Sequence, residues 1–181
     1  MNTIHIPQLE TPRLRLRALG HADFDAYAAM WKEATVVRFI GGAPLTREAA
    51  WSRFLRQMGA WYYLGFGFFA IEDKATGAFI GEVGFHELHR NIVPSIEGTL
   101  EAGWVLSTAA HGKGITEEAT RAALAWAERD HATKRVTCII RPNHFASLRI
   151  AAKLEFTEIV RTDYNGSPIV IFERASTVRR S

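Results

Sequence analysis

The sequence contains a single cysteine, Cys138, and no apolar run that approaches the roughly 18 residues of a membrane-spanning helix. One cysteine excludes a small domain held together by disulfides, and the short apolar runs exclude a transmembrane helix. The first residues, Met1–Arg17, lack the basic-then-apolar pattern of a secretory signal. We therefore expect a cytoplasmic protein that does not bind a membrane.

Charge of one sign is also not in strong excess. The 22 Lys and Arg residues are set against 19 Asp and Glu residues, which gives a net charge of +3 and a pI of about 9.2. The basic residues do not gather in one block, and the nearest to a cluster is Arg174, Arg179 and Arg180. No stripe interleaves basic and aromatic residues, so we expect no nucleic-acid or RNA partner.

Aromatic residues, by contrast, are plentiful. The chain has 5 Trp, 11 Phe and 4 Tyr residues, and 48% of it is apolar, which excludes disorder as the main state. A length of 181 residues fits one domain with a substantial core. The chain shows no tandem repeat, low-complexity stretch or linker. We predict a single domain over 1–181, with its core at about 10–174 and a tail at 175–181.

The first third of the chain predicts one strand and two helices. Leu14 and Leu16 alternate with arginines, as in a half-buried strand. A helix is predicted over 21–33, and a second over about 47–60 with Thr46 as its N-cap. The apolar stripe of the second helix is predicted to be core, and it comprises Trp51, Phe54, Leu55 and Met58.

The rest of the chain mixes hairpins with alternating strands and helices. Strands are predicted over 67–72, 78–88, 97–106, 134–141, 156–163 and 167–173, and helices over 115–129 and 144–154. Glycines in the turns at 73–77 and 165–166 favour hairpins. This order predicts an α/β fold of the mixed α+β kind, with a twisted mixed sheet of about seven strands and helices on both faces.

The segment from Trp104 to Ala119 is the most informative part of the chain. A strand ends, a loop with Gly112 and Gly114 follows, and a helix begins. Glycines allow backbone N–H groups to approach an anion, and a helix N-terminus adds partial positive charge. The segment therefore suits a pyrophosphate, although a glycine pair before a helix is also common as a tight turn.

Two familiar phosphate motifs do not fit this loop. A Walker A loop needs Ser or Thr after its Gly-Lys pair, but Gly114 follows Lys113. A dinucleotide fingerprint needs a third glycine, and residues 115–119 contain none.

Three segments together resemble the GCN5-related N-acetyltransferase superfamily. His111–Thr116 is similar to its acetyl-CoA loop, and the run from Asn143 through Ser147 to Phe156 is similar to its second cofactor segment. The opening Thr11–Arg17 resembles the branch that includes ribosomal-protein N-terminal acetyltransferases. The resemblance covers about 10–174, nearly the whole chain.

This resemblance implies a fold of the family's type and acetyl-CoA as cosubstrate. It implies acetyl transfer to a primary amine, on a small molecule or a protein N-terminus, by direct attack within a ternary complex. A homodimer is possible, because dimers are common in the family. The implied cofactor-binding positions are Trp104, Val105, Leu106, His111, Gly112, Lys113, Gly114, Ile115, Thr116, Asn143 and Ser147, with the indole of Trp104 expected in the core.

The sequence departs from the family pattern at four positions. His111 stands where Gln or Arg is usual, Thr116 where Gly or Ala is usual, and Glu117 where Thr is common. Glu155 replaces the usual Gly after the second cofactor helix. Because the end of a helix often needs a positive φ, Glu155 predicts either strain or a different cap.

Acetyl transfer to an amine needs a proton acceptor, since an alkylammonium has a pKa of roughly 10. Alternation places Glu82 and His86 on one face of their strand, and Glu101 lies on the next strand. Carboxylates in apolar strands are candidates for the general base. Glu101 ranks first because the family often has Glu there, Glu82 second and His86 third. For each of them, edge exposure or pairing with an Arg is the alternative.

The resemblance also implies roles in the second cofactor segment. Ser147 is a candidate proton donor for the thiolate, or else a hydrogen-bond partner of the backbone or the pantetheine arm. Asn143 is expected to cap the helix that follows and to bind the pantetheine amides. Backbone N–H groups of the strand at 104–106 are expected to stabilise the oxyanion.

Other signals in the sequence are weak. His86 and His89 have no third ligand in pattern, so no metal site is predicted. Cys138 lies in an apolar strand and is predicted to be a buried small hydrophobic residue rather than a nucleophile.

The competing hypothesis is a non-catalytic module that binds an acyl-CoA. The acceptor amine is left open among peptide N-termini, aminoglycosides, polyamines and amino acids.

Overall fold

The structure is a computed structural model that describes residues 5–132 and 134–175. The chain folds into two compact units. Unit 1 consists of the residues up to Gly84 and of Trp104–Ala122, and unit 2 consists of Phe85–Gly103 and the residues from Ala123 onward. Arg179, Arg180 and nearly all of the predicted tail lie outside the described residues, and the single domain over 1–181 stays a prediction.

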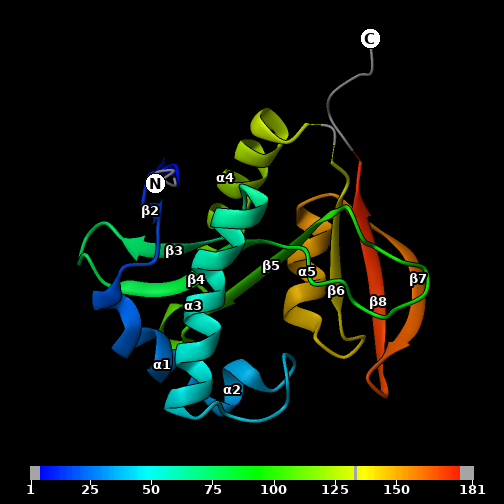
Figure 1. Cartoon of the computed structure of the whole chain (residues 1–181), viewed down its shortest axis with the longest axis horizontal. Coiled ribbons are helices and arrows are strands. Elements are labelled where there is room, and N and C mark those ends of the chain that lie inside the picture. Colours follow the sequence, from blue (N-terminus) through cyan, green and yellow to red (C-terminus); the bar gives the residue numbers. More distant parts are fainter. Residues whose placement is uncertain (1–4, 133, 176–181) are drawn as a thin grey trace. The chain divides into compact units, whose positions relative to one another are not determined.

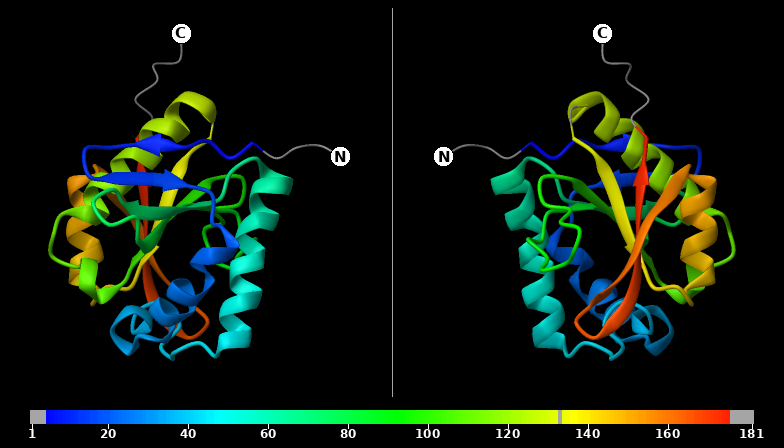
Figure 2. Two further views of the ribbon diagram at one scale, coloured as in Figure 1. Left: turned by 90° about the vertical axis from the view of Figure 1, so that its left-hand side faces the viewer. Right: turned by 90° about the vertical axis from the view of Figure 1, so that its right-hand side faces the viewer.

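Unit 1 holds the first four strands and the helices between them (Figures 1 and 2). Strands β1 to β4 pair in chain order, each antiparallel to the next. The elements of unit 1 are β1 (Leu9–Glu10), β2 (Leu14–Arg17), η1 (His21–Asp23), α1 (Phe24–Lys32), α2 (Ala34–Val37), α3 (Arg47–Leu64), β3 (Phe68–Asp73), the start of β4 (Phe79–His86), the end of β5 (Leu100–Leu106), η2 (Thr108–Ala110) and the start of α4 (Ile115–Asp130).

Helix α3 shows how local chemistry sets the ends of an element. The Thr46 hydroxyl accepts a hydrogen bond from the Ala49 N–H, which confirms the predicted cap. The helix continues past the predicted end at about residue 60, because Gly65 is the first residue to adopt the left-handed conformation, with φ 73°. The longer helix carries additional aromatic residues, among which Trp61 is buried.

The core of unit 1 lies around α1 and α3, which pack side by side (Figure 1). The rings of Tyr27 and Phe54 meet edge to face, with their centroids 5.2 Å apart. Of the predicted apolar stripe on α3, Phe54 is buried, Trp51 and Met58 are partly buried, and Leu55 is half exposed. The stripe is therefore core on one side only.

Unit 2 holds the remaining strands and α5 (Figure 1). The start of β5 runs parallel to β6, whereas β6, β8 and β7 are antiparallel neighbours in that order. Asn165 and Gly166 turn the chain between β7 and β8 with φ of 50° and 72°, as the predicted hairpin requires. The further elements are β6 (Val136–Ile140), α5 (Phe145–Lys153), β7 (Phe156–Tyr164) and β8 (Ser167–Arg174).

The strand order in the sheet is β1-β2-β3-β4-β5-β6-β8-β7. The predicted mixed sheet with helices is confirmed, with eight strands in place of about seven. The sequence patterns missed β1 and the single turn of α2. β1 is two residues long and depends on its partner Leu16, and α2 contains two β-branched valines that do not favour a helix.

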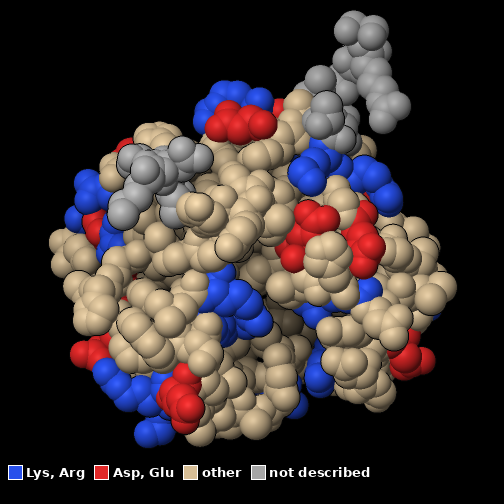
Figure 3. Space-filling view, viewed as in Figure 1, with Lys and Arg blue, Asp and Glu red and all other residues tan. Residues whose placement is uncertain are grey.

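Basic and acidic side chains are interspersed on the face that Figure 3 shows. Many charged side chains of the described residues form ion pairs, such as Arg15 with Glu10 and Arg135 with Glu173. Such exposed pairs contribute little to stability. Within the described ranges, no helix combines the length and the apolar character that would let it cross a membrane.

The end of α5 resolves the alternatives at Glu155, which adopts the left-handed conformation with φ 64°. A side chain with a Cβ is strained there by about 1–2 kcal/mol. Its carboxylate is 77% exposed and lies 3.7 Å from Arg174, so the ion pair contributes little.

Replacing Glu155 by Gly is therefore expected to stabilise the protein by about 1 kcal/mol, after allowance for the greater flexibility of the unfolded chain. Urea unfolding measures this change directly. The matched control is Glu155→Ala, which removes the carboxylate but keeps the strain, and it should give no gain. Equal stabilities for the two variants would contradict the assignment of strain to this position.

Candidate functional site

The site residues predicted from the sequence divide between the two units. Glu82, the strand end at 104–106 and the loop at 111–116 belong to unit 1, whereas His86, Glu101, Asn143 and Ser147 belong to unit 2. Their geometry is described here within each unit.

The loop before α4 has the backbone that its glycines predict. Gly112 and Gly114 both adopt φ 73°, a conformation that residues with a Cβ rarely take. Residues 111–114 are exposed, and α4 begins directly after them at Ile115. The N–H groups of the first helical turn have no partner within the helix, and the helix dipole adds partial positive charge there. The loop can therefore receive a phosphate group.

Two side chains brace the start of this loop. The ring of His111 donates a hydrogen bond from Nε2 to the Leu106 carbonyl, 3.0 Å away. The Thr108 backbone N–H donates to the Glu33 carboxylate at 3.1 Å, and its hydroxyl donates to the same oxygen. His111 thus closes the loop onto the end of β5, and Glu33 ties the loop to the end of α1.

A third brace comes from the Thr-Pro-Arg segment before β2. The Arg13 guanidinium donates from Nη1 to the Lys113 carbonyl at 2.9 Å and from Nε to Glu118 at 2.7 Å. The Thr11 hydroxyl donates to the other oxygen of Glu118 at 2.6 Å. Although burial raises the pKa of Glu118, the hydrogen bonds from Thr11 and Arg13 bring it below its usual value. In the sequence, this segment was informative mainly through its resemblance to the family.

The departures from the family pattern are accommodated locally. Thr116 is half-buried, and its carbonyl accepts a hydrogen bond from the Thr120 hydroxyl at 2.7 Å. The Glu117 carboxylate pairs with Arg121 one turn further along α4, at 3.0 Å. Its negative charge is therefore partly balanced within the helix.

The end of β5 at 104–106, which precedes the loop, differs from the prediction at one position, Trp104. Val105 and Leu106 are buried, with 7% and 4% of their surface exposed. Trp104 is half-buried, so the expectation of a core indole is wrong.

Glu82 lies on β4 with none of its surface exposed. Gln57 donates a hydrogen bond from Nε2 to the Glu82 Oε2 at 3.0 Å, and Nη2 of Arg53 lies 3.6 Å from Oε1. Burial raises the pKa of Glu82, and the nearby Arg53 and Gln57 oppose that rise. The sequence predicted Glu82 as a candidate but missed both α3 partners, Arg53 and Gln57, which lie four positions apart among other polar residues of that helix.

Within unit 1, β4 lies directly against the strand end that leads into the loop. The Ser107 N–H donates to the Ile80 carbonyl at 3.0 Å. A Cβ on Gly81 would lie 2.5 Å from the Val105 carbonyl oxygen, so only glycine allows this approach. Glu82 therefore follows the two residues of β4 that contact the end of β5.

Glu101 has a different environment in unit 2. Both of its carboxylate oxygens accept hydrogen bonds from Arg90, at 2.7 and 2.8 Å, in a bidentate pair. Only 7% of the Glu101 surface is exposed. The structure thus shows the pairing with an Arg that the sequence left open.

His86 is buried and lines a small cavity in unit 2 together with Glu101, Arg90 and Thr99. His89 lies on the loop that follows β4 and adopts the left-handed conformation, with φ 45°. Nδ1 of its ring lies 3.3 Å from the Glu97 carboxylate. The histidine pair noted in the sequence therefore consists of one buried and one exposed ring.

The second cofactor segment requires one correction. Asn143 does not cap α5, because the N-cap is His144, whose side chain makes no capping hydrogen bond. The His144 N–H donates to the Arg141 carbonyl, and this tight turn around Pro142 starts the helix one residue later than expected. Ser147 is buried on α5, with its hydroxyl 3.4 Å from the His144 ring.

Cys138 is buried on β6 with 1% of its surface exposed. Burial raises the pKa of its thiol, and the charge of Glu101 adds to the effect. A thiol held neutral in an apolar strand is a poor nucleophile, which confirms the prediction of a buried structural residue.

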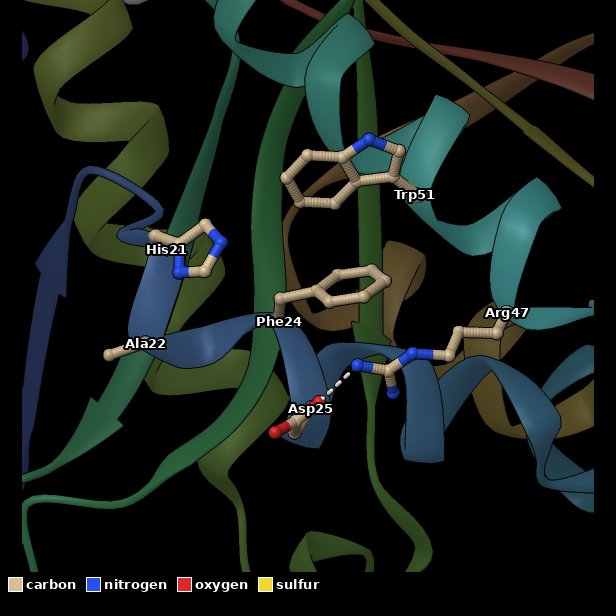
Figure 4. Close-up of a pocket in the computed structure, with 6 residues that line it drawn as sticks. All are labelled: His21, Ala22, Phe24, Asp25, Arg47 and Trp51. Carbon is tan, nitrogen blue, oxygen red and sulfur yellow. Dashed lines mark hydrogen bonds and ion pairs between the residues drawn. The ribbon is translucent and has the colours of Figure 1, made fainter.

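A larger cavity of about 380 Å³ lies in unit 1, where α1 and α3 begin (Figure 4). Phe24 and Trp51 form its aromatic wall, with their ring centroids 4.7 Å apart. Asp25 and Arg47 pair across its rim at 2.6 Å, and both side chains are exposed. None of the predicted site residues lines this cavity, and its two charges already satisfy each other.

Residues 13–157 match the family described as the acetyltransferase (GNAT) domain. The chain belongs to this family. As a GNAT acetyltransferase it transfers an acetyl group and takes acetyl-CoA as its cosubstrate, which confirms the resemblance found in the sequence. Among curated proteins, it is 28% identical to YkkB of Bacillus subtilis, a protein described as uncharacterized, over 93% of this chain and 96% of the relative.

Solved structures agree with this family. A GnaT-family acetyltransferase of Bordetella pertussis shares 31% identity, with a TM-score of 0.84 over 94% of this chain and all of that one. RimL, a ribosomal L7/L12 alpha-N-protein acetyltransferase in complex with coenzyme A, is 16% identical, with a TM-score of 0.73 over 93% of this chain and 97% of that one. At that identity RimL shares the fold alone.

The braced loop of this GNAT acetyltransferase leads to a prediction about Arg13. Replacing Arg13 by Ala removes the hydrogen bonds to the Lys113 carbonyl and to Glu118, so the loop loses its rigid position. We expect acetyl-CoA to bind about 10-fold more weakly, the effect of losing one charge-assisted hydrogen bond. Calorimetric titration with acetyl-CoA measures the change in Kd.

Arg15→Ala is the matched control, because Arg15 lies two residues further along the chain, in β2, and pairs with Glu10 and Glu72 instead. It should leave the Kd for acetyl-CoA unchanged. A weaker Kd in both variants would assign the effect to the strand as a whole and contradict the specific role of Arg13.

Proposed function

We propose that this GNAT acetyltransferase acetylates a primary amine by direct attack on acetyl-CoA, with Glu82 as the general base. The observation that carries the proposal is a fully buried carboxylate, with its pKa raised by burial, in the same compact unit as the loop at 111–116. A small molecule and a protein N-terminus are both acceptors of the right chemistry.

The reaction requires four changes of bonding. The amine nitrogen attacks the thioester carbonyl carbon, and the C–N bond forms while nitrogen gives up a proton. Glu82 accepts that proton, directly or through water. The C–S bond then breaks, and the thiolate of coenzyme A takes a proton from an acid. Ser147 is the candidate for this acid, and backbone N–H groups at 104–106 are the candidates for holding the oxyanion.

The surroundings of the two carboxylates favour Glu82 over Glu101 as the base. A base works best when its pKa lies close to the working pH, and burial moves the pKa of Glu82 in that direction. Both oxygens of Glu101 are occupied by Arg90, so proton uptake there would break a bidentate pair. We therefore place Glu82 first, and assign Glu101 to holding Arg90 and the loop that bears it.

Two measurements test the proposed transfer to a primary amine. A thermal shift with acetyl-CoA at about 100 times its Kd should correspond to about 2.7 kcal/mol of stabilisation. Release of coenzyme A thiol in the presence of an amine panel then reports turnover. Binding of acetyl-CoA with no turnover of any amine in the panel would overturn the proposed transfer to a primary amine. The homodimer and the cytoplasmic location stay predictions.

A further inference from the structure

Glu33 is the single residue between α1 and α2, and its backbone holds both helices. Its N–H donates to the Met30 carbonyl at 3.1 Å and closes the end of α1. Its own carbonyl accepts the N–H groups of Val36 and Val37, at 3.0 and 3.1 Å, and begins α2. The position of α2 therefore depends on Glu33.

The side chain of Glu33 reaches a different part of unit 1. Its half-buried carboxylate accepts hydrogen bonds from the Thr108 N–H, at 3.1 Å, and from the Thr108 hydroxyl, although the two residues are 75 positions apart. Within the described part of the chain, this carboxylate forms no ion pair. Hydrogen bonds to a charged acceptor are stronger than neutral ones, so Thr108 is firmly held.

Thr108 connects this contact to the acetyl-CoA loop at 111–116. Its carbonyl accepts the N–H of His111, the first residue of the loop, at 3.1 Å. One residue thus contacts Glu33 through its N–H and hydroxyl and the loop through its carbonyl. Since a single backbone conformation of Thr108 serves both contacts, the loop conformation and the contact with Glu33 favour each other.

The segment at 34–45, which follows Glu33, has little other support. Only Val36 and Val37 are buried among its residues, and no regular structure follows α2 until α3 begins. Beyond α2, the N–H of Gly42 donates to the Val37 carbonyl and that of Leu45 donates to the Trp31 carbonyl, each at 3.0 Å. Segments with few buried side chains open locally at a low cost in free energy. The order of this segment is therefore sensitive to what holds Glu33.

We propose that Glu33 is a positioning residue for acetyl-CoA binding, and that bound acetyl-CoA stabilises the segment at 34–45 through Thr108 and Glu33. Acetyl-CoA favours the loop conformation in which Thr108 contacts Glu33, and that contact in turn holds the start of the segment. Coupling between two sites is reciprocal, so the same contact strengthens acetyl-CoA binding. The proposal depends on the cosubstrate of the family and not on the identity of the general base or of the acceptor.

A purely electrostatic role of Glu33 predicts the opposite effect on binding. A carboxylate near a loop that receives a phosphate repels the anionic cofactor, so neutralising it would strengthen binding. A positioning role predicts weaker binding, because the amide of Gln accepts a weaker hydrogen bond from Thr108. The sign of the change in Kd therefore separates the two roles.

The first test measures the Kd for acetyl-CoA by calorimetric titration of Glu33→Gln, Thr108→Val and the double variant. Thr108→Val removes the hydroxyl and keeps the branched shape. We expect each single variant to bind about 5- to 10-fold more weakly, the effect of losing one charge-assisted hydrogen bond. The double variant should bind within about 2-fold of the weaker single variant, because both changes remove the same contact.

Two further variants serve as controls in the same titration. Thr108→Ser keeps both donors to Glu33 and should bind acetyl-CoA as the wild type does. Glu48→Gln makes the same chemical change as Glu33→Gln at an exposed position of α3 in unit 1, and it should also leave the Kd unchanged.

The second test measures hydrogen–deuterium exchange with and without saturating acetyl-CoA. In the wild type, acetyl-CoA should slow exchange at 34–45 by at least about 3-fold, because local opening there becomes less favourable. In Thr108→Val this protection should be lost, while the loop at 111–116 is still protected by the bound cofactor. Exchange thus reports the coupling separately from the affinity.

Three results would overturn the proposal. Tighter acetyl-CoA binding by Glu33→Gln would assign the carboxylate to repulsion. Lower melting temperatures of Glu33→Gln and Thr108→Val with unchanged Kd would show a purely structural contact. Equal protection of 34–45 by acetyl-CoA in the wild type and in Thr108→Val would show that the segment does not respond through this pair.

Discussion

Replacing Glu82 by Gln is expected to lower kcat by about 10²- to 10⁴-fold, the range that loss of a general base produces. The amide keeps the shape of the carboxylate and can still contact Gln57 and Arg53, but it cannot accept a proton at neutral pH. Because Glu82 is buried and its pKa is raised by that burial, the folded state loses little when the charge is removed. We therefore expect a folded, acetyl-CoA-binding and nearly inactive protein.

Glu101→Gln is the matched control for this prediction, since it makes the same chemical change in another buried strand carboxylate. It weakens the bidentate pair with Arg90 and should lower the free energy of unfolding by about 1–3 kcal/mol. Its kcat should stay within a few-fold of wild type. The opposite result, with Glu101→Gln inactive and Glu82→Gln active, would return the base to the position that the sequence ranked first.

The pH profile gives a further expected result for the same residue. The base acts in its ionised form, so activity rises as pH increases through the pKa of Glu82. Burial raises that pKa, and the acid limb of kcat/KM should therefore lie above the usual Glu range. The groups that face Glu82 are Arg53 and Tyr27. Burial raises the pKa of Tyr27, so its hydroxyl does not titrate on this limb. An acid limb at ordinary Glu values would contradict the assignment.

Local patterns predicted most elements of this fold because their causes lie close together in the chain. Thr46 caps α3 through a residue three positions away, and Asn165 and Gly166 form their turn by their own backbone preferences. β1 escaped prediction because a strand of two residues owes its existence to pairing with β2. The one-turn helix α2 likewise depends on the Glu33 carbonyl, which accepts the N–H groups of two valines that do not favour a helix.

The candidate site was less predictable, because its environments come from distant segments. Alternation along β4 placed Glu82 on a face, but its partner Gln57 is 25 residues away on α3. The ranking of Glu101 above Glu82 used the family pattern alone, and Arg90, which occupies both Glu101 oxygens, lies on a loop with no regular pattern. What burial and pairing do to a carboxylate is a property of the fold rather than of its local sequence.

The role of the Thr-Pro-Arg segment at 11–13 likewise depends on a distant part of the chain. Thr11 and Arg13 carried a family resemblance without a physical reason in the sequence. The structure supplies one, since both residues hold Glu118 at the start of α4, 105 to 107 positions along the chain. A motif at one end of the chain thus supports the cofactor loop in its middle.

Replacing Gly114 by Glu is expected to weaken acetyl-CoA binding by at least about 10³-fold. Gly114 adopts φ 73°, where a residue with a Cβ is strained by about 1–2 kcal/mol. A carboxylate within about 4 Å of a phosphate adds repulsion of about 1 kcal/mol in water and about 4 kcal/mol near a protein surface. With the protein-surface value the two costs sum to about 5–6 kcal/mol, which exceeds the roughly 4 kcal/mol that a 10³-fold change requires. A new Cβ would also lie 3.6 Å from Nη2 of Arg13 and disturb the brace of the loop.

Two variants separate the contributions of strain and charge. Gly114→Ala carries the strain without the carboxylate, so it should weaken acetyl-CoA binding by about 10-fold. Gly65→Glu carries both at the end of α3, where φ is also 73° and a Cβ would meet nothing within 4 Å. It should lower the melting temperature and leave the Kd for acetyl-CoA unchanged. Calorimetric titration of the three variants orders them, and normal acetyl-CoA binding by Gly114→Glu would remove the loop at 111–116 from the cofactor site.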